Sequence, residues 1–119
     1  NPERKAAHTF GPTVPAGSPP GLVPFTPTNN ISYFVGLDAY ETVPNAIISG
    51  DDNFTIGKMR LNAGLLLLDT NSPVTWTKER HVNMGNLALA DGSVQAFSTP
   101  AFRTALIKTG IATNRLAMP

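Results

Sequence analysis

The segment Gly50-Asp51-Asp52-Asn53 gathers hard oxygen donors at neighbouring positions. Carboxylate and amide oxygens of this kind are ligands that Ca²⁺ accepts, so Asp51, Asp52 and Asn53 are candidate metal ligands. Their spacing does not fit an EF-hand loop, and Gly, Asp and Asn are also the residues from which ordinary turns are made. Two interpretations therefore stay open for this segment: a plain turn and a Ca²⁺ site.

His81 is followed by nine residues and then by Asp91-Gly92. A histidine and an aspartate form an acid–base dyad only if their side chains meet. Here about five residues of strand, at roughly 3.3 Å each, hold the two apart, so we predict no dyad. We expect His81 to hydrogen-bond backbone groups of a neighbouring loop, with Asn83 and Asn86 in similar loop-tying roles. A ligand-binding role for His81 is the alternative.

Other catalytic arrangements are missing from the sequence. The chain has no cysteine, and its two histidines, His8 and His81, do not form an H-x-x-x-H pair. Thiolate chemistry, cysteine-ligated metals and zincin-like sites are thereby excluded. No G-x-S-x-G elbow, Walker A loop or G-x-G-x-x-G motif occurs. We therefore predict that the domain is not an enzyme and has no cofactor, apart from the Ca²⁺ considered above.

The charge of the chain gives no case for a nucleic-acid partner. The formal net charge is +1, and the aromatic pair Tyr33 and Phe34 lies in an acidic stretch, where a basic groove would be needed. Residues 31–53 hold four acids and no Lys or Arg, whereas residues 54–119 hold seven bases and three acids. This separation predicts either two oppositely charged faces suited to self-assembly or ordinary surface charge.

A β-hairpin is the clearest local structure in the sequence. Residues 86–97 alternate as two strands do, and Asp91-Gly92 at their centre favours a two-residue type I′ turn. That turn places Leu89 opposite Val94. This register assigns the core face to Leu87, Leu89, Val94 and Ala96, and the other face to Phe97.

A helix is predicted directly after the hairpin. Ser98 or Thr99 can cap its first turn, Pro100 fits the first helical position, and Gly110 follows the last turn. The apolar stripe of this helix consists of Phe102, Ala105 and Leu106.

Short strands are predicted before the hairpin, at residues 31–35, 46–49, 54–59 and 74–76. Residues 65–68 are ambiguous. Four leucines favour helix by propensity, but the run is too short to show a period.

Proline is concentrated at the beginning of the chain. Seven of the eleven prolines are Pro2, Pro12, Pro15, Pro19, Pro20, Pro24 and Pro27. Because proline fixes φ and lacks a backbone donor, residues 1–30 are predicted to form a Pro/Gly-rich extended arm, either draped over the domain or partly disordered. Draping is favoured by the apolar residues Phe10, Leu22, Val23 and Phe25. Residues 31–119 are then the globular part.

The spacing around His81 also resembles a family signature. His81, Asn86, Asp91-Gly92 and Val94 match the H-X9-DG domain of prepilin-type proteins, which are abundant in planctomycetes and verrucomicrobia. Residues 31–38, 50–53 and 112–119 are similar to other segments of that domain. The resemblance therefore covers about residues 31–119.

The resemblance implies a pseudopilin or type IV pilin-like subunit. Such subunits carry an N-terminal cleavage and methylation site and a long hydrophobic helix that anchors them in the inner membrane before assembly. No run of this chain approaches the ~20 apolar residues that span a bilayer, so we expect it to be the head from which that helix is missing. Contact with the membrane would go only through the missing helix. The implied location is periplasmic or extracellular.

The combined prediction is an α+β fold: a small antiparallel sheet of pilin type with a C-terminal helix and the Pro-rich arm. The predicted function is a structural, non-catalytic head domain in a type II secretion or type IV pilus-related system. Its partners would be copies of itself or related pilin-like subunits. The alternative is a secreted module that binds carbohydrate or Ca²⁺ through Trp76, Tyr33 or the loop 51–53; Trp76 could equally be a core residue.

Overall fold

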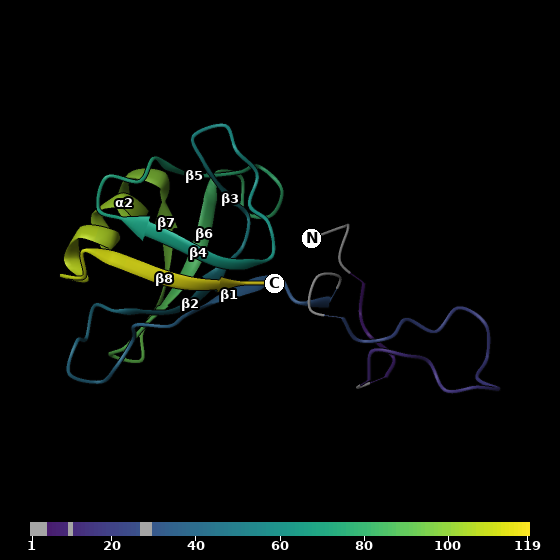
Figure 1. Cartoon of the computed structure of the whole chain (residues 1–119). Coiled ribbons are helices and arrows are strands. Elements are labelled where there is room, and N and C mark those ends of the chain that lie inside the picture. Colours follow the sequence, from purple (N-terminus) through teal and green to yellow (C-terminus); the bar gives the residue numbers. More distant parts are fainter. Residues whose placement is uncertain (1–4, 10, 27–29) are drawn as a thin grey trace.

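Residues 5–9, 11–26 and 30–119 are described by a computed structural model (Figure 1). Its elements are β1 (Tyr33–Gly36), β2 (Ile47–Asp51), β3 (Phe54–Ile56), β4 (Gly64–Asp69), β5 (Val74–Trp76), β6 (Met84–Leu89), β7 (Val94–Ser98), α2 (Thr99–Lys108) and β8 (Thr113–Met118). One helix and a mostly antiparallel set of strands in the described residues confirm the α+β prediction.

Six of the strands form one antiparallel sheet in the order β4-β8-β1-β2-β6-β7, and β3 pairs with β5 in a separate two-stranded ribbon. The ambiguous leucine run lies in β4, where all six residues pair with β8. Strand β8, which the sequence did not predict, lies between β4 and β1 and joins them. The last strand of the chain therefore lies inside the sheet, next to the edge strand β4.

The core lies between one face of the six-stranded sheet and a second layer made of α2 and the ribbon. Phe34 of the sheet meets Phe54 of the ribbon edge-on, with ring centroids 5.8 Å apart. Trp76 stacks on Phe102 of α2 with centroids 4.8 Å apart. Trp76 is only 1% exposed, so its interpretation as a core residue is confirmed. It lies against Gly85, where an added Cβ would come within 2.4 Å of the indole.

Helix α2 agrees with the prediction. Ser98 is the N-cap and its hydroxyl accepts a hydrogen bond from the backbone N–H of Ala101, while Pro100 lies in the first turn. Gly110 follows the helix with φ of 69°, as a left-handed stop requires. The predicted stripe is the buried one: Phe102, Ala105 and Leu106.

The hairpin is present, but its predicted register is wrong by one residue. Leu87 pairs with Gln95 and Ala88 with Val94, and the N–H of Gly92 donates to the carbonyl of Leu89 at 3.0 Å. The loop therefore has three residues and needs a positive φ only at Gly92, where φ is 85°. The consequence is a swap of faces: Leu87 and Leu89 are buried as predicted, Val94 and Ala96 are exposed, and Phe97 packs against the core.

The described residues of the Pro-rich arm, 5–9 and 11–26, form neither helix nor strand. The N–H of His8 donates to the carbonyl of Val23 at 2.8 Å, and the N–H of Phe25 donates to the carbonyl of Gly11 at 3.0 Å, so the arm folds back on itself. In Figure 1 it extends to one side of the sheet and does not lie across it. Three residues used in the prediction, Pro2, Phe10 and Pro27, are outside the described residues.

No helix in the described ranges has the length and apolarity needed to cross a lipid bilayer.

Candidate functional site

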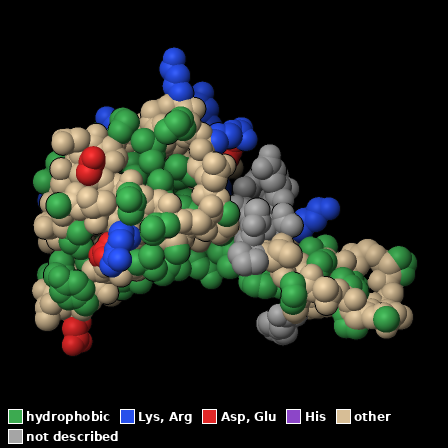
Figure 2. All heavy atoms as spheres, viewed as in Figure 1, with side chains coloured by type: hydrophobic (Ala, Val, Ile, Leu, Met, Phe, Trp, Pro, Cys, Tyr) green, Lys and Arg blue, Asp and Glu red, His purple; other side chains and the backbone are tan. Residues whose placement is uncertain are grey.

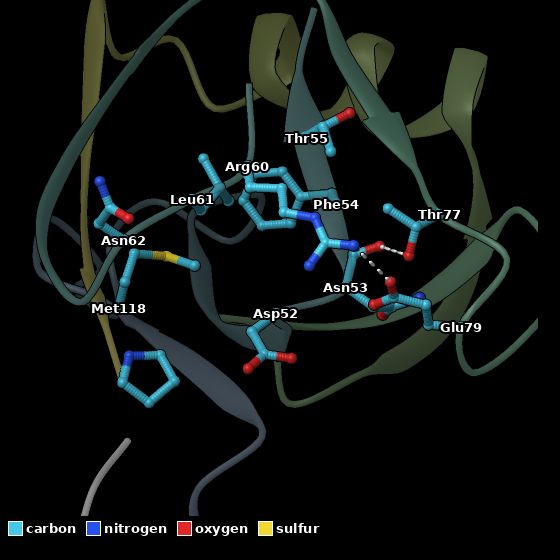
Figure 3. A pocket seen from close by; sticks show the side chains of 11 residues that line it. Asp52, Asn53, Phe54, Thr55, Arg60, Leu61, Asn62, Thr77, Glu79 and Met118 are labelled. Carbon is cyan, nitrogen blue, oxygen red and sulfur yellow. Dashed lines mark hydrogen bonds and ion pairs between the residues drawn. The ribbon is translucent and has the colours of Figure 1, made fainter. Parts of the chain in front are cut away.

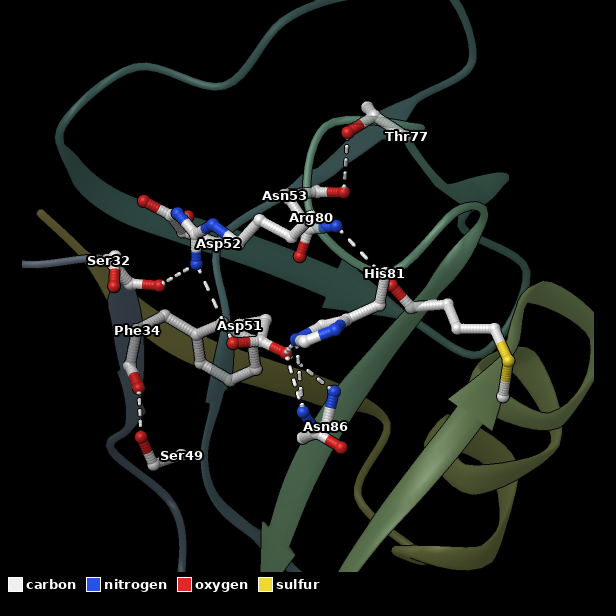
Figure 4. Close-up of polar contacts among 11 residues, drawn as sticks. Ser32, Phe34, Ser49, Asp51, Asp52, Asn53, Thr77, Arg80, His81 and Asn86 are labelled. Atoms are coloured by element: carbon white, nitrogen blue, oxygen red, sulfur yellow. Dashed lines mark hydrogen bonds and ion pairs between the residues drawn. The ribbon is translucent and has the colours of Figure 1, made fainter. Parts of the chain in front are cut away.

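Five polar residues meet where β2 ends and β6 begins, and we call them the Asp51 cluster: Asp51, Asp52, Arg80, His81 and Asn86 (Figure 4). Strand β2 and the residue after it supply the two acids. The loop between β5 and β6 supplies Arg80 and His81, and β6 supplies Asn86. The structure thus brings together two of the candidate metal ligands and two residues of the H-X9-DG signature.

Asp51 is the centre of this cluster. One oxygen, Oδ2, accepts hydrogen bonds from the backbone N–H of Asn86 at 2.8 Å and from its side-chain amide at 3.2 Å. The Nε2 of His81 lies 3.5 Å from the same oxygen and 3.3 Å from the amide nitrogen of Asn86. The contacts of His81 are therefore side chains of β2 and β6, and not the backbone groups of a neighbouring loop that we expected.

Arg80 is a member of the cluster that the sequence did not predict. Its side chain is only 8% exposed. The guanidinium donates to the carboxylate of Asp52 and to the backbone carbonyl of Ser32, and it lies 3.6 Å from Oδ1 of Asp51. One buried cation therefore joins the residue before β1, the end of β2 and the loop before β6. One feature of the sequence could have indicated this contact. Residues 31–53 hold four acids and no Lys or Arg, so any ion pair of these acids must use a base from another part of the chain.

The loop that carries Arg80 and His81 is held in an unusual conformation. Val82 and Asn83 have φ of 46° and 63°, in the left-handed region that L residues seldom occupy. The N–H of Asn83 donates to the carbonyl of Thr77 at 3.0 Å and closes the loop. This is the loop-tying role predicted for Asn83, carried out by its backbone.

Asp91 and Gly92 lie at the far end of the hairpin from His81, so the structure does not bring these parts of the signature together. Oδ1 of Asp91 accepts a hydrogen bond from the N–H of Ser93 at 2.8 Å. Hydrogen bonds from Ser93 lower the pKa of Asp91 below its ordinary value. Both residues serve the turn.

The ion pairs of Arg80 involve the same carboxylates that were predicted as Ca²⁺ ligands. The carboxylates of Asp51 and Asp52 already face a guanidinium, which a cation would have to displace. Within the described ranges no three His, Cys, Asp or Glu side chains gather as metal ligands. The Ca²⁺ site stays a prediction for experiment.

A pocket of about 250 Å³ opens beside Asp52 and Asn53 (Figure 3). Asn53 is 5% exposed, and its side-chain amide donates to the carbonyl of Met84 at 3.3 Å. Arg60 reaches Glu79 across the mouth at 3.8 Å, and Phe54 and Met118 add apolar wall. The lining mixes charge, amides and apolar surface.

The outward side of the six-stranded sheet, which we call the open face, carries a continuous row of side chains. Cross-strand pairing joins one residue from each strand, in the order Leu65, Ala117, Val35, Ser49, Ala88 and Val94. Leu65, Val35 and Val94 are 64%, 44% and 69% exposed. Figure 2 shows hydrophobic side chains gathered over the middle of the globular part, on the side where β4 and β8 face the viewer. No single strand of the sequence reveals this row, because each contributes one residue.

The charge next to this row is neutralised. Arg115 lies opposite Leu67 on the open face, and its Nε donates to Oδ1 of Asp38 at 2.8 Å. The second oxygen of Asp38 accepts the backbone N–H of Arg115 at 2.7 Å. The hydrogen bond from the Arg115 side chain is the largest cause of the lowered pKa of Asp38.

Searches against protein-family models, curated proteins and solved structures found no match to this chain.

Proposed function

We propose that this domain is the structural, non-catalytic head of a pilin-like subunit, and that it works by packing its open face against other protein. The observation that carries the proposal is the six-residue row across all six strands. A solvated face of an antiparallel sheet normally carries polar side chains, whereas this row consists of apolar and small ones with a single serine. An exposed apolar band of this kind is typical of a contact surface.

The proposed partners are further copies of the chain or related pilin-like subunits in a type II secretion or type IV pilus-related system, at a periplasmic or extracellular location. The resemblance around His81 supports this choice of family, because the residues that carry it anchor the two ends of the hairpin formed by β6 and β7. Asn86 and His81 hold the start of β6 against Asp51, and Gly92 closes the other end of the hairpin.

The coding sequence upstream of Asn1 gives the first test. A pilin-like subunit requires a prepilin-type cleavage site followed by about 20 apolar residues. A cleavable secretory signal peptide in that place would contradict the proposal.

Covering of the open face gives the second test. Because the chain has no cysteine, Val35→Cys creates a unique labelling site at the centre of the row. In the full-length protein assembled in cells, thiol labelling at this position should be at least about tenfold slower than in the purified chain. Ile107→Cys, on the exposed side of α2, is the matched control. Equal labelling rates at Val35→Cys in the two samples would refute a covered open face.

A ligand-binding module is the second candidate, and the pocket beside Asp52 and Asn53 is the observation that favours it. Trp76 is buried and gives no sugar platform, whereas Tyr33 is 52% exposed. A ligand that binds only the native state raises the melting temperature. Our main proposal expects no rise with Ca²⁺. A rise that disappears in Asp52→Asn, which changes a residue lining the pocket, would support the second candidate.

A further inference from the structure

Strand β4 is an edge of the six-stranded sheet, and β8 is its partner on the inner side. Natural edge strands usually carry Lys, Pro or a bulge that prevents pairing with another chain. Strand β4, with the sequence Gly-Leu-Leu-Leu-Leu-Asp, pairs with β8 over its full length without a bulge and has one charge, at its end. Leu65 and Leu67 are 64% and 55% exposed beside this edge. The edge lacks these defences.

The backbone of β4 also has groups available for pairing. In an antiparallel ladder, successive residues direct their N–H and C=O alternately to the two sides. The N–H of Asp69 donates to the hydroxyl of Ser72 at 3.0 Å, on the side away from β8. Leu67 and Leu65 lie two and four residues before Asp69, so their backbone N–H and C=O groups also point away from β8. Outside the ladder, no hydrogen bond in the described part of the chain involves the backbone of Leu65 or Leu67.

We propose that β4 pairs with β4 of a second copy of this chain, antiparallel and about a two-fold axis, to give a closed dimer with one continuous sheet. In one continuous sheet, residues that lie opposite each other point to the same face. Odd-numbered residues of β4 must therefore pair with odd-numbered residues of the second copy. The register that satisfies this sets Leu65 opposite Leu67 of the second copy, and Leu66 opposite its own equivalent on the axis. Both pairs of Leu65 and Leu67 then exchange two backbone hydrogen bonds each.

Charge supports the same register. Asp69 then comes opposite Ala63 of the second copy, three residues beyond Arg60 of that copy. Arg60 is 85% exposed, and its ion pair with Glu79, at 3.8 Å, is a surface contact that costs little to exchange. Each β4 therefore has the basic Arg60 before its start and the acidic Asp69 at its end. Antiparallel pairing brings the Arg60 of one copy near the Asp69 of the other, and it does so twice.

Pairing of β4 with the other edge, β7, fits less well. The register that keeps apolar side chains together sets Leu65 opposite Ala96 and Leu67 opposite Val94. It then places Asp69 opposite Gly92, next to the acidic Asp91. This contact would also be heterologous and would leave edges free at both ends of the assembly.

The dimer adds to the proposed function by naming one partner, a second copy of this chain. It rests on the proposed function only in the assumption that the domain assembles with other subunits. Its surface is the edge of the sheet, whereas the proposed function rests on the open face. A chain that stays monomeric would refute the edge dimer. A signal peptide upstream or an uncovered Val35→Cys would refute the proposed function.

Sedimentation velocity of the purified chain over a wide concentration range is the experiment. We expect a monomer–dimer equilibrium that Leu67→Lys weakens at least about tenfold, because a lysine at the edge is the device that natural sheets use. Ile107→Lys is the matched control, because Ile107 has similar exposure on α2, away from both the β4 edge and the open face, and it should leave the equilibrium unchanged. A monomer at all concentrations, an assembly that Ile107→Lys abolishes, or growth beyond the dimer would each overturn the proposal.

Amide hydrogen exchange measured by NMR on the same chain locates the contact. The N–H groups of Leu66 and Leu68 point toward β8 and should be protected at every concentration. The N–H groups of Leu65 and Leu67 should become protected only as the dimer forms. A dimer in which Leu65 and Leu67 exchange as fast as in the monomer would refute the pairing of β4 strands.

Discussion

Replacing Arg80 by methionine removes the cation that holds the Asp51 cluster together. The side chain of Arg80 is 8% exposed, and its guanidinium serves Asp51, Asp52 and the carbonyl of Ser32 at once. Methionine keeps much of the apolar stem but leaves two nearby carboxylates without the guanidinium. Removing one partner of a buried ion pair costs about 3–5 kcal/mol, because a charge stays buried without its compensation. A domain of this size has a total stability of about 5–15 kcal/mol, so this loss is a large fraction.

Urea unfolding measures the loss. For a slope of about 2 kcal/mol per molar urea, Arg80→Met should lower the midpoint by roughly 2 M. Arg60→Met is the matched control, because Arg60 is 85% exposed and its pair with Glu79 should contribute less than about 1 kcal/mol. Arg80→Lys should fall between the two, since an ammonium cannot reproduce the planar fork of the guanidinium. Equal midpoints for the Arg80→Met and Arg60→Met variants would refute the role given to Arg80.

Substitutions at three further positions test other parts of the structure. Gly85→Ala should cost about 1–3 kcal/mol in urea unfolding, since its Cβ would lie 2.4 Å from the ring of Trp76; an unchanged midpoint would contradict this packing. Gly92→Val should cost about 1–2 kcal/mol because φ at this position is 85°, whereas Gly92→Asn should be tolerated better; the reverse order would exclude the observed turn. Asp38→Asn removes a carboxylate whose pKa is lowered from 3.8 by Arg115, so its stabilising effect is present at neutral pH and is lost as the pH falls through the lowered pKa. The melting temperatures of the wild type and the variant should therefore converge in acid. A difference that stays constant with pH would contradict the pairing.

Local signals in the sequence predicted helix α2 well and the hairpin only in part. The helix carries its own stop and start residues, so its bounds follow from Ser98, Pro100 and Gly110 without tertiary information. The hairpin turn does not, because two-residue and three-residue loops both place Gly92 at a positive φ. Packing made the choice: the observed register puts the large ring of Phe97, and not Val94, on the core side.

The Asp51 cluster shows a different limit of sequence reasoning. Asp51 and Asp52 were identified from composition, but their partner Arg80 lies 28 residues from Asp52 along the chain. Nothing local ties a base at that distance to an acidic turn. The contact arises because β2 pairs with β6, which brings the loop before β6 over the end of β2. Long-range pairing also decided the place of β8, which has no distinctive signal of its own.

The nine-residue spacing between His81 and Asp91 has a physical reason that needs no chemistry between them. His81 lies before β6 and Asp91 lies in the turn after it, so the nine intervening residues measure the length of one strand and its approach. A strand one residue shorter would turn His81 away from Asp51 or move the turn off Gly92, because alternate residues point to opposite faces. The spacing of these two residues is therefore set by the length of the hairpin and by its anchorage at the start of β6. The proposed packing surface depends on the same length, because its row crosses the hairpin at Ala88 and Val94.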